Sequence, residues 1–245
     1  MGYQTVTFFS TTFSGATNPA LTPIPFTSTT GTSGNTIRYD AIGGLSSGPA
    51  ALASFAGTSA DCYGQYDLGS QVPTSRKIFT FIFNVKFVIL PYVGLSSQHI
   101  SLFRVTGTDG ILANVQLYKP AAGTPKLRIS DAEHSTNTNG TTTLSAATWY
   151  EIKLVLDATP GSESLTLYLD GAQEAQKTGT GAFTRRVGSL LFGGVTGSGV
   201  PSLGVNWYID TITCTAQVPF AQIPVMNKSF RPMGSTNIGS IGVGF

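Results

Sequence analysis

The sequence predicts an all-β protein, an antiparallel two-sheet sandwich followed by an extended C-terminal arm. Alternation of apolar and polar residues with period two recurs from end to end, and no sustained helical periodicity accompanies it. The 245-residue chain contains 29 Gly and 13 Pro, which separate the alternating segments, and only 11% of its residues are charged. Strands with one apolar and one polar face are typical of antiparallel sheets that face water on one side.

The clearest strand lies over Phe79–Ile89, where aromatic and aliphatic residues occupy every second position. Tyr150–Leu156 and Leu165–Leu169 alternate in the same way, with charged or hydroxyl residues between the apolar ones. Turn signals separate the weaker strand candidates from one another. These further candidates are Thr5–Phe9, Thr36–Ala41, Tyr63–Leu68, Ser101–Thr106, Ala113–Tyr118, Lys126–Ser130, Val187–Phe192 and Val205–Thr215.

Two dipeptides predict tight hairpins, Asp109-Gly110 and Asp170-Gly171, because glycine accepts the positive φ of such turns. One short helix is expected over Pro49–Phe55, where Pro49 would occupy the first turn.

The domain boundary is expected near residue 216, giving a sandwich domain over 1–216 and an arm over 217–245. The arm holds two charges, Lys228 and Arg231, and is too rich in Gly and Pro for a helix or a long strand. Its large apolar side chains favour burial, so we expect it to dock chiefly on neighbouring subunits. The apolar residues assigned to this assembly arm are Phe220, Phe230, Ile238, Ile241 and Phe245.

Several partner classes are excluded by composition and charge. The net charge of +2 and the lack of any basic cluster larger than Arg76-Lys77 or Arg185-Arg186 argue against a nucleic-acid partner. The longest apolar run, Phe87–Leu90, is too short to insert into a membrane. The N-terminus lacks a secretory pattern, so we expect that the chain is made in a cytoplasm or is a mature form that starts with an added Met. Cys62 and Cys214 could pair or remain buried free thiols, the outcome expected in a reducing compartment.

Four segments between Thr148 and Ala216 carry a resemblance to a known superfamily. They are Trp149-Tyr150-Glu151-Ile152-Lys153-Leu154, Leu165-Thr166-Leu167-Tyr168-Leu169-Asp170-Gly171, Leu190-Leu191-Phe192-Gly193-Gly194 and Trp207-Tyr208-Ile209-Asp210-Thr211-Ile212. This order resembles concanavalin A-like lectins and glucanases, especially their laminin-G-like members. The resemblance implies a jelly-roll sandwich in which Trp149 belongs to the core and the last strand lies beside the first. It says little about function, because this fold serves lectins, hydrolases, lyases and adhesion modules.

No catalytic constellation is recognisable. Glycosidases of this superfamily use closely spaced carboxylates on one strand, and the only candidate pair here, Asp131 and Glu133, is expected in a polar loop. His99 follows Gln98 in an order that differs from the related lyases, and it is expected to end a strand in solvent. The hydrolase motif G-x-S-x-G is missing. We therefore expect no enzymatic activity and no required cofactor.

Two kinds of ligand remain candidates. The resemblance to laminin-G-like domains makes Ca²⁺ a candidate ligand of Asp109 and Asp131, with the alternative that each carboxylate caps its own turn. Glycans are bound by exposed aromatic rings with polar neighbours, and Trp207, Tyr92 and Tyr118 are the candidates.

The leading functional hypothesis is a structural or accessory virion protein, such as a bacteriophage head or tail decoration protein. It rests on the charge-poor ends of the chain and on an apolar arm after a rigid sandwich, which suit assembly into a homo-oligomer or onto other virion subunits. The alternative is a carbohydrate-binding lectin module, in the virion or outside the cell. A glycan-degrading enzyme is the least favoured hypothesis.

Overall fold

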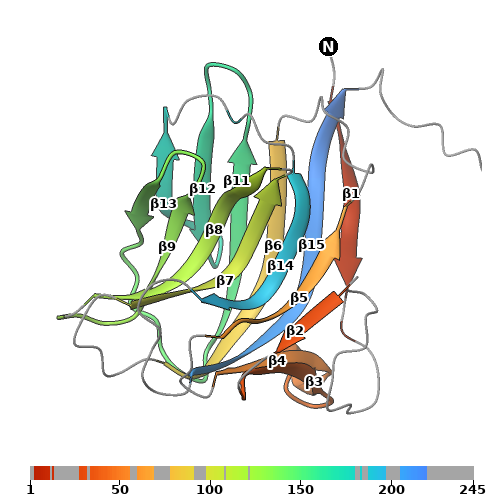
Figure 1. Ribbon diagram of the computed structural model, residues 1–245, viewed down its shortest axis with the longest axis vertical. Helices are drawn as coiled ribbons and strands as arrows, with labels where there is room; N and C mark the ends of the chain where they lie inside the picture. Colours follow the sequence, from red (N-terminus) through yellow and green to blue (C-terminus); the bar gives the residue numbers. More distant parts are fainter. Residues whose placement is uncertain are drawn as a thin grey trace, which may run out of the picture.

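Two antiparallel β-sheets lie face to face in the computed structural model of the chain (Figure 1). The structure describes residues 3–11, 13, 28–31, 34–55, 60–68, 78–90, 98–107, 109–120, 122–179, 183, 187–196 and 205–219. Within them, the one helical element is a short 3₁₀ turn over Leu45–Ser47, and no helix is long and apolar enough to cross a membrane.

Sheet A is the larger sheet. In order across the sheet it contains β13 (Ala172–Thr178), β12 (Ser164–Leu169), β11 (Trp149–Asp157), β6 (Ile78–Ile89), β15 (Val205–Pro219), β4 (Ala50–Phe55) and β3 (Thr36–Asp40), and β1 (Tyr3–Thr11) also pairs with β15. Sheet B contains β10 (Thr136–Asn139), β9 (Lys126–Asp131), β8 (Gly110–Lys119), β7 (Gln98–Gly107), β14 (Val187–Thr196), β5 (Cys62–Asp67) and β2 (Ser28–Gly31). The predicted all-β jelly-roll sandwich is thereby confirmed.

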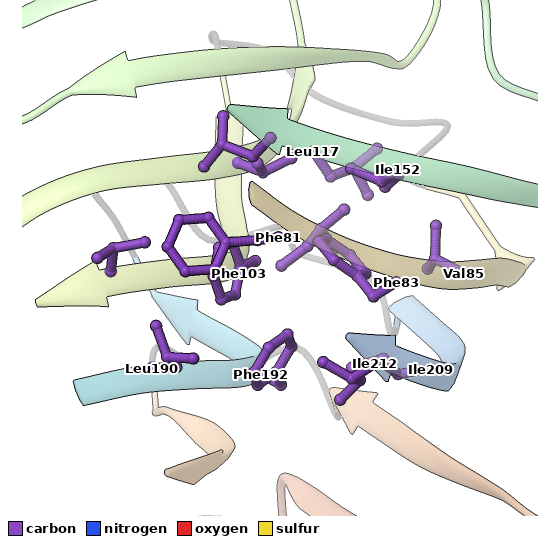
Figure 2. Packing of buried hydrophobic residues seen from close by; sticks show 14 of the residues in the cluster. Phe81, Phe83, Val85, Phe103, Leu117, Ile152, Leu190, Phe192, Ile209 and Ile212 are labelled. Carbon is purple, nitrogen blue, oxygen red and sulfur yellow. The ribbon is translucent and has the colours of Figure 1, made fainter. Parts of the chain in front are cut away.

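The hydrophobic core fills the space between the sheets (Figure 2). Phe81 and Phe83 of β6 are fully buried, and the neighbouring strand β11 places Leu154 and Ile152 beside them. The ring of Phe103 in sheet B lies 5.1 Å from that of Phe81 and 5.5 Å from that of Phe83, centre to centre. The alternating face of β6 therefore joins the two sheets.

Strand β15 closes the sandwich and confirms that the last strand lies beside the first. One edge of β15 pairs with β6, while its other edge pairs with β4 near Val205 and with β1 near its end. The pairing shifts between Asp210 and Thr213, and Thr211 has a φ of 46°. The strand continues to Pro219, which pairs with Tyr3, so the body extends three residues beyond the expected boundary at 216.

The short helix expected over Pro49–Phe55 is wrong, because β4 occupies Ala50–Phe55. Strands β3 and β15 pair with its two edges, and alanines along β4 allow close packing on both faces. Tertiary pairing here overrides the helical preference of alanine. Strands β2, β10 and β13 were not predicted from the alternation of apolar and polar residues, because they are short or largely polar.

Two further core assignments have different outcomes. Trp149 was expected in the core, but it is half-buried on the outer face of sheet A, opposite Lys86. Its position, one residue before the buried Tyr150, gives it the outward direction of the pleat. Cys62 and Cys214 are both free and buried, and burial raises the pKa of the Cys62 thiol to about 12.

Candidate functional site

The outer face of sheet B carries an ordered array of polar side chains on three adjacent strands. Strands β7, β8 and β9 pair antiparallel, so every second residue points away from the core and meets its neighbours across the sheet. We call these nine residues the sheet B array. Its three rows are Arg104, Asn114 and Ser130; Ser101, Gln116 and Arg128; and His99, Tyr118 and Lys126.

A bulge in β7 keeps its contribution to the array on one face. The register between β7 and β8 shifts between Ser101 and Phe103, and Leu102 and Phe103 are both buried. If alternation ran unbroken from Ser101, Arg104 would point into the core, because it is an odd number of residues further along the strand.

Each arginine of the array is held by an amide on the neighbouring strand. Arg104 donates from Nε to Oδ1 of Asn114 at 2.8 Å, and Arg128 donates from Nε to Oε1 of Gln116 at 2.5 Å. The guanidinium carbon of Arg128 also lies 4.6 Å from the centre of the Tyr118 ring. Since Nε is used for positioning, the outer edge of each guanidinium is directed away from the amide that holds it.

The base of the array is unusually buried for a polar surface. Ser101, Asn114 and Gln116 are 1%, 4% and 5% exposed, and Gln116 donates from Nε2 to Oγ of Ser101 at 3.5 Å. Burial of polar groups is tolerated when they are hydrogen-bonded, and these amides meet that condition through the arginines above them. The array is thus a layered structure, with amides below and cations above.

The two arginines of the array, Arg104 and Arg128, do not form an ion pair with a carboxylate of the described residues. Burial lowers the pKa of Arg104 and Arg128, although both remain protonated at neutral pH, and Asp61 and Tyr63 oppose the effect at Arg104. The ion pair formed between two described residues is that of His134 with Asp131, which directly follows Ser130 of the array on β9 and pairs with neither arginine. Neither guanidinium therefore has a carboxylate within ion-pair distance among the described residues.

His99 is half-buried at the second position of β7, opposite Tyr118, rather than at a strand end in solvent. Burial lowers the pKa of its imidazole, and the charges of Arg128 and Arg104 lower it further. The imidazole is therefore neutral at neutral pH and can donate one hydrogen bond and accept another. With two arginines, a lysine, three buried polar groups and a phenol, the array can bind a ligand rich in hydroxyl and anionic groups.

The predicted aromatic residues have three different positions. Tyr118 is part of the array. Trp207 is fully buried, its indole 5.2 Å from the Phe55 ring, so it offers no surface to a glycan and that assignment is corrected. The reason is the pleat of β15, which directs Trp207 inward and its neighbour Tyr208 outward. Tyr92 lies outside the described residues.

The predicted metal ligands are not brought together. Asp109 is exposed in the β7–β8 turn, whereas Asp131 is 1% exposed and accepts hydrogen bonds from the backbone N and the ring Nδ1 of His134. Across the described segments, no group of three His, Cys, Asp or Glu side chains could hold a metal ion. Asp157 accepts from the backbone N of Thr159, as expected of an aspartate that caps its own turn. The arm residues from Phe220 onward lie beyond the described part of the chain.

Most of the array was missed by sequence reasoning. A signal was present, because Asn114, Gln116 and Tyr118 alternate on one strand and Lys126, Arg128 and Ser130 alternate on the next. The missing step was the strand pairing that places these two sets side by side. Because of the bulge at Leu102, His99 and Arg104 point to the same face of the sheet, although strict alternation would place them on opposite faces.

Solved structures with this architecture include proteins with carbohydrate-related names. The cellulose-induced protein Cip1 has a TM-score of 0.55 at 12% identity, covering 75% of this chain and 87% of its own. An endo-β-1,4-glucuronan lyase from the fungus Trichoderma reesei has a TM-score of 0.53 at 11% identity, covering 81% and 93%. A carbohydrate esterase from the Shiga toxin-encoding bacteriophage phi24B has a TM-score of 0.51 at 15% identity, covering 77% and 89%. At these identities the similarity establishes the lectin/glucanase-like sandwich fold alone.

Family membership comes from a sequence model. The model described as the SO2946-like, C-terminal domain matches residues 46–210, which run from β4 into β15 and include the whole array. This chain therefore belongs to the SO2946-like C-terminal domain family. No curated protein is significantly similar to it.

Proposed function

We propose that this protein is a non-enzymatic carbohydrate-binding protein that holds a saccharide chain across the sheet B array. The single observation that carries the proposal is the amide-supported pair of arginines beside Tyr118 on an otherwise hydroxyl- and amide-rich face. Sugars are recognised by hydrogen bonds to hydroxyls together with contacts to ring faces, and the array offers both. The names of the glucuronan lyase and the phage esterase, which share the fold, agree with a carbohydrate ligand.

A matched pair of tyrosine variants tests this proposal. Tyr118→Ala removes the ring beside Arg128, and Tyr168→Ala removes a half-buried tyrosine on the outer face of sheet A, where Lys153 lies 4.1 Å from its ring. Affinity electrophoresis through gels containing different polysaccharides should show retardation of the wild type and the Tyr168 variant but not of the Tyr118 variant. Equal retardation of both variants would place glycan binding elsewhere, and no retardation of the wild type in any gel would refute the proposal.

The absence of catalysis is part of the proposal. Retaining or inverting hydrolysis requires a pair of carboxyl groups, and none of the nine array residues carries one. We expect no release of reducing ends and no unsaturated product from neutral or acidic polysaccharides. If turnover occurred and was abolished in both His99→Gln and Tyr118→Phe, the neighbouring imidazole and phenol would be an acid–base pair and the protein would be an enzyme.

A second candidate function is assembly into a virion, as the composition of the two chain ends suggests. Residues 1–60 contain only Arg38 and Asp40 as charged residues, and the arm contains only Lys228 and Arg231. Because β15 pairs with β1 as far as Pro219, the informative truncation removes 220–245 rather than 217–245. That truncation should keep the cooperative melting of the wild type and lose self-association in sedimentation experiments. If the truncated protein lost its cooperative melting, the arm would be part of the sandwich domain of its own chain. The main support for assembly would then be removed.

A further inference from the structure

The sheet B array also indicates the charge of its ligand. Arg104 and Arg128 are half-buried, each is fixed through Nε, and neither has a carboxylate partner within ion-pair distance among the described residues. Removing a cation from water without pairing it is unfavourable, so such an arrangement favours a ligand that supplies the anion. A guanidinium held through Nε can still donate two parallel hydrogen bonds to a planar anion such as a carboxylate.

The spacing of the two arginines restricts the ligand further. They lie on β7 and β9 with β8 between them, so two strand spacings of about 4.8 Å separate their strands. Their rows are also offset by one outward-facing position, since Arg104 is level with Asn114 and Arg128 with Gln116. The separation of their strands, about 10 Å, is on the scale of two linked sugar rings. In an extended saccharide chain, alternate sugars present equivalent groups to the same side.

We infer that the ligand is a carboxylated polysaccharide, a chain of uronic acid residues, whose alternate carboxylates are bound by Arg104 and Arg128. This inference rests on the proposed function and specifies its ligand class. A more highly charged polymer, such as a sulfated glycan or a nucleic acid, fits less well, because those ligands require larger basic patches. In the described part of the array the only other cationic side chain is Lys126.

Tyr118 and the buried amides have separate parts in this arrangement. Tyr118 stacks against Arg128 and can contact the face of a sugar ring, while Asn114 and Gln116 fix the orientation of the two guanidinium groups. Neutral His99 adds a hydrogen bond to a sugar hydroxyl without adding charge. The two arginines would thus bind the carboxylates of alternate sugars, while Tyr118 and His99 contact the uncharged parts of the chain.

The test compares a polyuronate with the same polymer after chemical reduction of its carboxylates to hydroxymethyl groups. Isothermal titration calorimetry with polyglucuronate oligosaccharides should show binding by the wild type and at least about tenfold weaker binding of the reduced oligosaccharides, or about 1.4 kcal/mol. Arg104→Gln and Arg128→Gln should each weaken polyglucuronate binding by a similar factor. Arg38→Gln, on the exposed outer face of sheet A, is the matched control and should bind as the wild type does.

The arginine-to-lysine variants separate charge from geometry. Arg104→Lys and Arg128→Lys keep the charge but lose the planar fork, and both should bind nearly as weakly as the glutamine variants. Equal binding of native and reduced oligosaccharides would overturn the carboxylate inference and leave glycan binding intact. Failure to bind any saccharide would instead overturn the proposed function itself. Tighter binding of a sulfated glycan or of RNA than of polyglucuronate would also overturn the inference.

Discussion

The two outer faces of the sandwich treat their cations in opposite ways. On sheet A, Nζ of Lys86 lies 5.0 Å from the ring centres of both Trp149 and Tyr208. On sheet B, Arg104 and Arg128 are held by amides through Nε. Lys86 has aromatic rings as its partners, whereas each arginine is oriented by an amide through Nε, and Arg128 in addition lies over the Tyr118 ring. This difference in how the cations are held is the basis on which we propose a ligand for sheet B rather than for sheet A.

A loop over residues 40–49 covers part of the outer face of sheet A. The carboxylate of Asp210 accepts a hydrogen bond from the backbone N of Leu45 at 2.8 Å, and Tyr208 donates to Asp40 at 3.0 Å. These contacts hold residues 40–49 on the outer face beside β15. A Cβ on Gly43 would lie 2.1 Å from the Tyr208 ring, so glycine is required for this close approach.

The largest expected effect concerns the core that both faces share. Phe81→Ala should reduce the free energy of unfolding by about 3–5 kcal/mol, because the fully buried ring packs against both sheets. Urea denaturation measures this change, and Phe8→Ala, at the partly buried margin, should cost less. A reduction below about 0.5 kcal/mol for Phe81→Ala would contradict the assigned direction of β6.

The next effect separates stability from binding on sheet A. Asp210→Ala removes the acceptor of the Leu45 and Thr211 backbone N–H groups and should destabilise the protein by about 1–3 kcal/mol. Glycan binding should be unchanged, because Asp210 lies on the sheet opposite the array. Thermal melting and affinity electrophoresis of the same sample test both statements, and a loss of binding would mean that the two faces are coupled.

The reverse separation is expected on sheet B. Gln116→Leu leaves Nε of Arg128 without its acceptor and removes the hydrogen bond to Ser101, so the guanidinium loses its fixed orientation. We expect about a 5–10-fold loss of glycan affinity, of the order of one hydrogen bond. The change in unfolding free energy should be smaller than that of Asp210→Ala. Gln176→Leu, on the outer face of sheet A, provides the matched control.

The fold was more predictable from the sequence than the site, for a physical reason. Period-two alternation in strands such as Phe79–Ile89 follows directly from burial of one face, so those strands and their direction were found. The array depends on which strands pair and on a bulge at Leu102, and neither follows from local pattern. Trp149 and Trp207 show the same limit, because a large aromatic residue indicates a strand without specifying its face.

The smallest effect is a difference between the two faces in their response to pH. Burial and the two arginines lower the pKa of His99 below its ordinary value of 6.5. As pH falls below 6.5, the unfolded chain binds a proton at this position that the folded protein resists, so stability decreases until the lowered pKa is reached. On sheet A the corresponding group is Asp40, whose pKa is lowered from 3.8 chiefly by the backbone N–H of Ile42. Its stabilising contribution is present above pH 3.8 and is lost as pH falls through the lowered value.

The two groups therefore act in separate pH windows and can be distinguished by single substitutions. Urea denaturation between pH 7.5 and 5 should show a smaller loss of stability in His99→Gln than in the wild type. In the same range, Asp40→Asn should lose as much stability as the wild type does. Below pH 4 the order should reverse, with the wild type losing stability relative to Asp40→Asn. A bound polyuronate would reduce the first effect, because its carboxylates offset the field of Arg104 and Arg128 at His99 and raise the imidazole pKa toward its ordinary value. If polyuronate bound to the wild type but left its pH dependence unchanged, the ligand would lie away from His99. The proposal that sheet B, and not sheet A, binds the ligand would then have to be abandoned.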